Sequence, residues 1–338
     1  MQAGKSSIQF EHPPIITSAA SIVGQTEGEG PLASFFDRVE PDPTFGKKSW
    51  EEAESELQRQ TVQKCLDKAG RQAADVNCLF AGDLLGQIVA TSFGVESFDI
   101  PFFGLYGACS TMGEALSLGA MAVAGGYGDR VLAVTSSHFG TAEKEFRFPL
   151  DYGSQRPLSA SWTVTGSGAF ALGLNQKCRA HITGMTPGRI VDYGLKDSMN
   201  MGACMAPAAA DTVARHMEDF HVTPEEYDRI ITGDLGSVGQ TVLIDLLREK
   251  GIDIADRHMD CGIEIFDAEA QDTHAGGSGC GCSAVTLAAY VLPKLESGEW
   301  KKVLFLPTGA LLSKTSFNEG KSVPGIAHAV VLESPAVK

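Results

Sequence analysis

The sequence predicts an α/β protein of two similar halves, each a β-α-β type unit with mostly parallel strands, stacked about a pseudo-twofold axis. Strand-like and helix-like runs alternate along the chain. A buried strand that ends in Gly-Asp-Leu occurs twice, at 76–84 and 227–235. A cysteine turn rich in small residues, placed before a helix, also occurs twice, at 107–110 and 277–284. The same order of elements in both halves indicates an internal duplication.

The elements of the first half follow in a regular order. Residues 15–23 predict a strand, and Ser49 with Glu52 forms a capping-box signature that opens a helix. The apolar run 100–106 stops at Gly107, and a helix of small residues follows. We therefore expect Cys109 in the first turn of that helix.

The remaining elements complete both halves. Strands are predicted at 130–138 and 163–172, separated by an aromatic and charged insertion at about 139–160. In the second half, 201–207 is expected to be a loop beside the crevice, before an alanine-rich helix. Residues 301–309 repeat the pattern of the strand that begins at Arg130. We expect the two halves to span residues 1–175 and 176–338.

Composition and charge restrict the possible functions. The 338 residues carry a formal net charge of −15, which argues against binding to nucleic acid or directly to an anionic membrane. No apolar run approaches the length of a membrane span, and the first residues lack the apolar region of a signal peptide. The eight scattered cysteines are typical of free thiols in a reducing compartment.

Neither a metal site nor a cofactor is predicted. Cys280 and Cys282 lie near His274, but a second cysteine or histidine pair at zinc-finger spacing is missing from the sequence. The Gly-Ser-Gly at 166–168 lies within a strand-like run and not before a helix, which argues against a nucleotide-binding loop.

Cys109 is the residue with the clearest chemical potential. The unpaired N–H groups and the dipole at a helix start shift a thiol toward the nucleophilic thiolate. The alternative is a small buried residue where a strand and a helix cross closely. In either case, we expect Cys109 to line a pocket.

The motifs together resemble the stage V sporulation protein AD family, within the thiolase-like superfamily. The segments that carry the resemblance span nearly the whole chain, in order: 10–13, 81–85, 107–111, 135–138, 163–168, 205–212, 232–235, 275–280, 308–313 and 326–328. The resemblance implies a thiolase-like homodimer that binds dipicolinic acid, alone or as its calcium chelate. It also implies a peripheral protein at the spore inner membrane. There it would act with other stage V sporulation membrane proteins in uptake and release during sporulation and germination.

The resemblance also lets the sequence be tested for enzyme activity. Condensing enzymes of this fold use a cysteine with a histidine and an asparagine or second histidine. The corresponding places here are 232–236 and 277–280, and neither contains those residues. Asp234 near the thiol would also raise its pKa. We therefore expect a protein that is not an enzyme. The alternatives are an acyltransferase or ketoacyl synthase that uses Cys109, and a structural adaptor with a vestigial pocket.

A planar dicarboxylate requires N–H groups, hydroxyls and a cation as partners. Phe146 or Tyr152 could stack on a pyridine ring. Arg147 and Arg156 could supply the cation, and the alternative for them is a solvated loop or a subunit contact. His138 could face the same crevice, and the alternative for it is a hydrogen-bonded residue at a strand end. The predicted ligand-binding residues are Cys109, Ser110, Thr111, His138, Arg147, Arg156, Asp234, Ser278 and Cys280.

Overall fold

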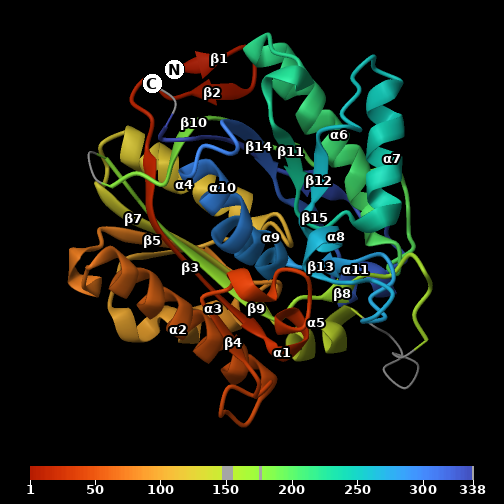
Figure 1. Ribbon diagram of the computed structural model, residues 1–338. Helices are drawn as coiled ribbons and strands as arrows, with labels where there is room; N and C mark the ends of the chain where they lie inside the picture. The colour runs from red at the N-terminus through yellow and green to blue at the C-terminus, as the bar shows by residue number, and fades with distance from the viewer. Residues whose placement is uncertain (147–154, 175–176, 337–338) are drawn as a thin grey trace.

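The computed structural model describes residues 1–146, 155–174 and 177–336 and arranges the main strands in two joined half-sheets (Figure 1). From the centre outward, the first half-sheet contains β3 (Ile15–Gly24), β9 (Gly166–Gly173), β7 (Arg130–Ser137), β5 (Cys78–Gly82) and β6 (Phe102–Gly104). The second contains β10 (Ala180–Thr186), β17 (Ala329–Glu333), β14 (Lys302–Leu306), β11 (Arg229–Thr232) and β12 (His258–Asp260).

The two half-sheets have the same topology. β9 in the first half-sheet and β17 in the second run antiparallel to their neighbours. The other four described strands of each half-sheet share one direction. β3 and β10 join the halves by a short antiparallel pairing. The mirrored order confirms the predicted duplication and the mostly parallel strands.

Short strands complete the structure. β1 (Gln2–Ala3), β2 (Ser7–Gln9) and β4 (Arg38–Glu40) pair at the margins of the large sheet. β8 (Trp162–Thr163) pairs with β13 (Gly277–Ser278), and β15 (Thr308–Ala310) pairs with β16 (Gly325–Ala327). The β8–β13 pair joins the two halves of the chain.

Helices cover both half-sheets and also separate them (Figure 1). α2 (Trp50–Ala69) and α3 (Val89–Val95) pack outside the first half-sheet, and α6 (Met201–Phe220) and α7 (Gly236–Arg248) outside the second. Between the half-sheets lie α4 (Thr111–Ala124) and α9 (Cys280–Thr286), which continues through a π-helical segment (Leu287–Val291) into α10 (Leu292–Glu296). The short helices are α1 (Gln25–Gly28), α5 (Phe139–Phe146), α8 (Cys261–Ile265) and α11 (Lys314–Asn318). Among the described residues, no helix combines the length and hydropathy needed to cross a bilayer.

The small residues of the central helices are explained by close packing, because a half-sheet lies on each side of these helices. Met112 and Leu116 of α4 are fully buried in the cluster that includes Phe170 and Phe305 from the two half-sheets. A side chain at Gly113 would approach the backbone of His328 to 2.8 Å. Small residues therefore let α4 fit between the half-sheets.

Two local predictions are wrong. α4 begins at Thr111, so Cys109 lies in the turn before the helix and not in its first turn. The expected loop at 201–207 is helical, because the Asn200 side chain caps α6 by accepting the Ala203 N–H at 3.3 Å. Pro207 lies inside that helix. The predicted boundary between the halves, 175–176, lies outside the described residues.

Candidate functional site

The turn at Gly107–Ser110 holds Cys109 at the start of α4. Ala108 has a φ of 50°, in the left-handed region that residues other than glycine rarely adopt. The Gly107 carbonyl accepts the Ser110 N–H at 3.1 Å and the Ser110 hydroxyl at 2.7 Å. The Thr111 hydroxyl donates to the Ala108 carbonyl at 2.6 Å and accepts the Gly107 N–H at 3.1 Å. These bonds maintain the strained turn that places Cys109 at the pocket.

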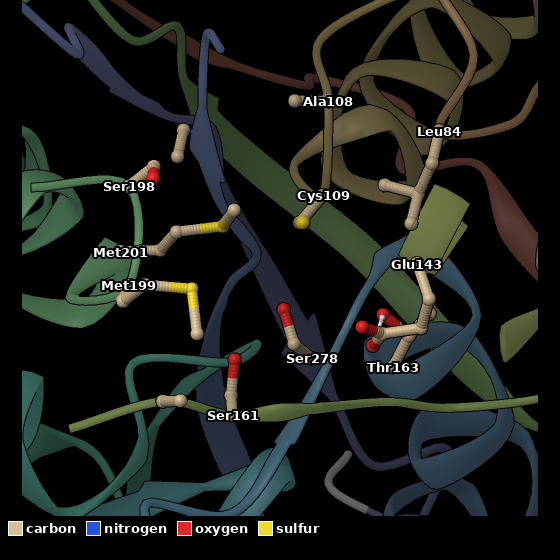
Figure 2. A pocket seen from close by; sticks show the side chains of 12 residues that line it. Leu84, Ala108, Cys109, Glu143, Ser161, Thr163, Ser198, Met199, Met201 and Ser278 are labelled. Carbon is tan, nitrogen blue, oxygen red and sulfur yellow. Dashed lines mark hydrogen bonds between the residues drawn. The ribbon is translucent and has the colours of Figure 1, made fainter. Parts of the chain in front are cut away.

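A pocket beside Cys109 encloses about 570 Å³ of space, including its open mouth. Figure 2 shows the Cys109 sulfur at one end, with Met199 and Met201 on one side and Glu143 and Thr163 on the other. The elements that contribute come from both halves of the chain. The lining residues are Leu84, Ala108, Cys109, Glu143, Ala160, Ser161, Thr163, Ser198, Met199, Met201, Ser278 and Ala310.

Asp234 lies behind this pocket and organises it. One carboxylate oxygen accepts the Ser278 hydroxyl at 3.1 Å and the Gly279 N–H at 2.9 Å, and the other accepts the Thr308 hydroxyl at 2.8 Å. The Cys109 thiol also hydrogen-bonds this carboxylate. Gly279 has a φ of 108°, which glycine alone adopts readily. Asp234 therefore connects the cysteine turn to β13 and β15.

The surroundings of Cys109 suppress its nucleophilic form. Burial raises the pKa of the thiol well above its ordinary value, and the Asp234 charge and the hydrogen bond to Asp234 raise it further. Burial also raises the pKa of the Asp234 carboxyl. Of the two alternatives for Cys109, these surroundings favour the small buried residue and oppose the thiol activated by a helix start, and the effect of Asp234 has the expected direction.

This electrostatic setting predicts a slow thiol. Below the raised pKa of Cys109, iodoacetamide is expected to alkylate it more slowly than Cys78, which is half-buried and whose pKa is raised by burial. Labelling of Cys109 should rise with pH, and Asp234→Asn should shift that rise to lower pH. Peptide mass spectrometry over a pH series measures both effects. Labelling of Cys109 ahead of Cys78 at neutral pH would contradict the prediction.

Some predicted residues lie at the site without lining the pocket. Ser110 and Thr111 are fully buried, and both hydroxyls donate within the cysteine turn. Cys280 is also fully buried and donates its thiol to the Ser136 carbonyl at 2.9 Å. Of the predicted residues that the structure describes, Cys109 and Ser278 line the pocket and Asp234 contacts both.

His138 is held away from the pocket. Its Nε2 bonds the Pro43 carbonyl at 2.8 Å, and its Nδ1 accepts the Gly140 N–H at 3.0 Å. Its ring lies beside Phe45 and Trp50, and burial lowers its pKa. These contacts support the structural interpretation of His138, a hydrogen-bonded residue at a strand end.

Arg156 likewise binds other parts of the protein. Its guanidinium bonds Asp272 at 2.6 Å and lies over the Trp162 ring, 5.0 Å from the centroid. It is not among the described lining residues. Arg147 and Tyr152 lie outside the described residues, as does the side chain of Phe146.

Sequence reasoning missed much of the pocket. Glu143 and Thr163 lie in or after a segment that reads as a charged and aromatic insertion. Met199 precedes the segment that was expected beside the crevice, and only the folded chain brings it opposite Glu143 (Figure 2). No spacing in the sequence connects these residues to Cys109.

A buried polar network lies behind Cys280. Glu54 accepts the hydroxyls of Ser136 at 2.9 Å and Thr141 at 2.5 Å. Burial raises its pKa to about 8. Asp83 accepts the N–H groups of Leu85 and Thr91, both at 2.8 Å, as expected for a carboxylate in a turn at a strand end. Because Glu54 and Asp83 are acidic, this network supplies no positive charge to the pocket.

Comparisons with known sequences identify a family. The profile of the family described as Stage V sporulation protein AD (SpoVAD) matches residues 4–333. Stage V sporulation protein AD of Bacillus subtilis (strain 168) is 42% identical over 330 residues, covering 98% of this chain and 97% of that protein.

Solved structures share the fold at low sequence identity. The 3-oxoacyl-[acyl-carrier-protein] synthase III of Aquifex aeolicus VF5 has a TM-score of 0.57 and 14% identity, over 95% of this chain and 99% of that chain. OleA of Xanthomonas campestris, in a variant form, has a TM-score of 0.61 and 14% identity, over 96% of this chain and 100% of that chain. These likenesses confirm the thiolase-like fold and, at such identity, the fold alone.

Proposed function

The chain belongs to the stage V sporulation protein AD family, and we propose that it binds dipicolinic acid, alone or as its calcium chelate, without catalysing acyl transfer. One observation carries the proposal: the Cys109 thiol hydrogen-bonds a buried carboxylate, which opposes thiolate formation. The resemblance to the condensing enzymes implies a histidine within 232–236 and an asparagine within 277–280, and the sequence has neither there.

The composition of the pocket supports a planar aromatic ligand. Leu84, Met199 and Met201 offer apolar surface to a ring, and methionine sulfur contacts aromatic rings favourably. Thr163 and Ser278 on the pocket lining already donate their hydroxyl hydrogens to Glu143 and Asp234, whereas the Ser198 hydroxyl on the same lining can donate to a carboxylate oxygen. A pocket with apolar sides and a few polar groups suits a small aromatic acid.

In this proposal the protein serves a transport step at the spore inner membrane. It lies at the membrane surface as a peripheral protein, held by other stage V sporulation membrane proteins. It receives dipicolinic acid during sporulation and takes part in its release during germination. The sporulation family supports this role.

Calorimetric titration with dipicolinate, with and without calcium, tests the proposal. We expect saturable binding and, in parallel incubations with acetyl-CoA, no mass increase at Cys109. Isophthalate, which has two carboxylates but no ring nitrogen, is the matched control ligand and is expected to bind more weakly. A stable acyl adduct on Cys109 without dipicolinate binding would refute the proposal.

An acyltransferase that uses Cys109 is the second candidate, because the similar structures include a 3-oxoacyl-[acyl-carrier-protein] synthase III. The structural adaptor is the third, and it predicts that Cys109→Tyr, which fills the pocket, leaves the partner contacts unchanged. Mass spectrometry of the acetyl-CoA incubation tests the acyltransferase, and pull-down of membrane partners tests the structural adaptor.

We also propose that the chain forms a homodimer through β6. This strand ends the described sheet, and Phe102 and Phe103 on it are 37% and 56% exposed. Phe93 and Tyr106 add exposed aromatic surface nearby in the chain. Antiparallel pairing of two β6 strands about a twofold axis would satisfy both edges and cover these rings.

A charge on this edge is expected to separate the dimer. Phe103→Asp should convert the dimer to a monomer, because a carboxylate would be buried at the interface opposite its own copy. Sedimentation velocity at micromolar concentration measures the change. Phe317→Asp, at an exposed aromatic residue on α11, is the control and should stay dimeric. A wild-type protein that sediments as a monomer would disprove the dimer.

A further inference from the structure

A buried carboxyl group connects α2 to the wall of the pocket. Glu54 of α2 is fully buried, and its Oε2 lies 2.5 Å from the hydroxyl of Thr141 on α5. Ala142, next to Thr141, packs in one apolar cluster with Leu84 and Cys109, which line the pocket (Figure 2). The ionisation of Glu54 can therefore act on the pocket through its charge and through α5.

The hydrogen bonds around Thr141 need one hydrogen more than an ionised Glu54 leaves. The Thr141 oxygen lies 2.5 Å from Glu54 Oε2 and 2.9 Å from the His138 carbonyl oxygen, and both are acceptors when Glu54 is a carboxylate. A hydroxyl has one hydrogen and can donate to only one of them. A proton on Glu54 resolves this conflict, because Glu54 then donates to Thr141 and Thr141 donates to His138.

A second acceptor in the same network also lacks a hydrogen. The Nε2 of Gln58, one turn after Glu54 on α2, lies 3.1 Å from the Ser136 hydroxyl oxygen and 3.2 Å from that of Thr91. Its buried Oε1 has no hydrogen-bond partner among the described residues. The network thus has more acceptors than hydrogens, and a proton on one of its carboxyl groups reduces that deficit.

The charges nearest Glu54 also favour its protonated form. Burial contributes most and raises the pKa of Glu54 to about 8, and repulsion from Asp83 and from Glu51 acts in the same direction. Lys144, the cation of α5, pairs with Glu51. His138, which follows β7, is uncharged at neutral pH because burial lowers its pKa.

The other elements around Glu54 add further acidic groups. On α5, Glu143 accepts the Thr163 hydroxyl and Glu145 pairs with Lys314 at 3.1 Å. On α9, burial and the charge of Glu54 raise the pKa of the Cys280 thiol well above its ordinary value. β3, β9 and α3 contain no acidic or basic side chain within their bounds.

We propose that Glu54 keeps a proton while the pocket holds its anionic ligand, so that dipicolinate binding is coupled to protonation of Glu54 and weakens in alkaline solution. The inference rests on the proposed function. An ionised Glu54 adds a buried negative charge near a dianion and leaves Thr141 with two acceptors for one hydrogen.

The direction of the pH dependence follows from this coupling. The bound dianion opposes ionisation, so the ligand-bound protein has the higher Glu54 pKa. Binding is at full strength below the pKa of the free protein, about 8, and weakens as the pH rises above it. The loss is up to about tenfold for each pH unit, with uptake of up to about one proton per ligand. The dipicolinate carboxylates are already ionised in this range and take up no proton.

Calorimetry on the full chain with metal-free dipicolinate tests the inference. Titrations between about pH 6.5 and 9.5, in buffers of different ionisation enthalpy, report both the affinity and the protons taken up per ligand. Wild-type protein is expected to bind more weakly above about pH 8 and to take up protons there. Glu54→Gln, whose amide can donate to Thr141 as the protonated acid does, should lose both effects and keep its affinity.

Glu56→Gln is the matched control on the same helix. Glu56 pairs with Arg59 at 2.6 Å, and the hydrogen bond to Arg59 lowers its pKa to about 2, far below the range of the titrations. The Glu56→Gln protein should therefore show the pH dependence and the proton uptake of the wild type.

A second variant tests the contact with α5. The Thr141 hydroxyl lowers the pKa of Glu54, and Thr141→Val removes this hydroxyl while keeping a side chain of nearly the same shape. The weakening of dipicolinate binding is expected to begin at a higher pH in Thr141→Val than in the wild type. An onset at the same pH would contradict the assigned role of Glu54.

The outcomes separate this inference from the proposed function. Wild-type binding of metal-free dipicolinate with equal affinity at about pH 7 and pH 9 and without proton uptake would overturn the inference and leave the proposed function standing. Binding of the calcium chelate alone would do the same. Undiminished proton uptake in Glu54→Gln would assign the proton to another buried group, such as Glu27, whose pKa burial raises to about 7. That result would also overturn the inference, and wild-type protein that binds neither ligand form at any pH would overturn both.

Discussion

Replacing Cys109 with tyrosine is expected to abolish dipicolinate binding. The Cys109 sulfur faces the cavity at one end, and the side chain contacts Leu84, Ala142 and Cys280 in a small apolar cluster (Figure 2). Since this cluster leaves no room for a ring, the tyrosine must project into the ligand space. We expect a loss of at least about 3 kcal/mol of binding free energy, or about 100-fold in Kd. Calorimetric titration measures it.

A smaller side chain provides the matched control for this substitution. Cys109→Ala keeps the cavity open and should retain binding within about tenfold, since it removes from the lining one sulfur atom and no charged group that could contact the ligand. Circular dichroism and the thermal midpoint show whether each variant is folded. If folded Cys109→Tyr bound dipicolinate as the wild type does, the ligand site would lie elsewhere.

Replacing Asp234 with alanine is expected to destabilise the folded protein strongly. Asp234 is 2% exposed and accepts bonds from the Ser278 hydroxyl, the Gly279 N–H and the Thr308 hydroxyl. The alanine leaves these buried donors without their acceptor, at about 1–3 kcal/mol for each unsatisfied group. Because hydroxyls can find other acceptors, we expect a total loss of about 3–5 kcal/mol. Urea denaturation followed by fluorescence measures the free energy of unfolding.

Asp234→Asn separates hydrogen bonding from charge. The amide oxygen can still accept bonds from part of this set, and the neutral side chain avoids burial of a charge. We therefore expect a smaller loss than with alanine. Equal losses in the two variants would show that the negative charge itself stabilises the site, and a loss below about 1 kcal/mol for alanine would contradict the assigned network.

The order of elements could be predicted from the sequence because it depends on local patterns. The capping box of Ser49 and Glu52 opens α2 as expected, with the Glu52 N–H donating to the Ser49 hydroxyl at 3.3 Å. The repeated Gly-Asp-Leu after β5 and β11 follows from the duplication, and the mirrored sheet order confirms it. Local spacing also selected Cys109 and Ser278, which do line the pocket.

Side-chain direction could not be predicted in the same way. His138 directly follows β7, but its ring turns to Pro43 and Trp50 and not to the pocket. Arg156 reads as a free cation, but Asp272 and Trp162 hold its guanidinium. The hydrogen-bonding partners Pro43 and Asp272 lie 95 and 116 residues away in the sequence, so a pattern of neighbouring residues contains no information about them.

The sequence by itself determined the duplicated α/β architecture, the family and the cysteine turn, since each depends on residues close together in the chain or on motifs in a constant order. Tertiary structure alone decided the charge and the lining of the pocket. Glu143 and Met199 face each other across the cavity, and Asp234 reaches Cys109, because helices and strands from both halves converge there. The pKa of the Cys109 thiol follows from that convergence, since burial and the facing carboxylate exist only in the folded chain.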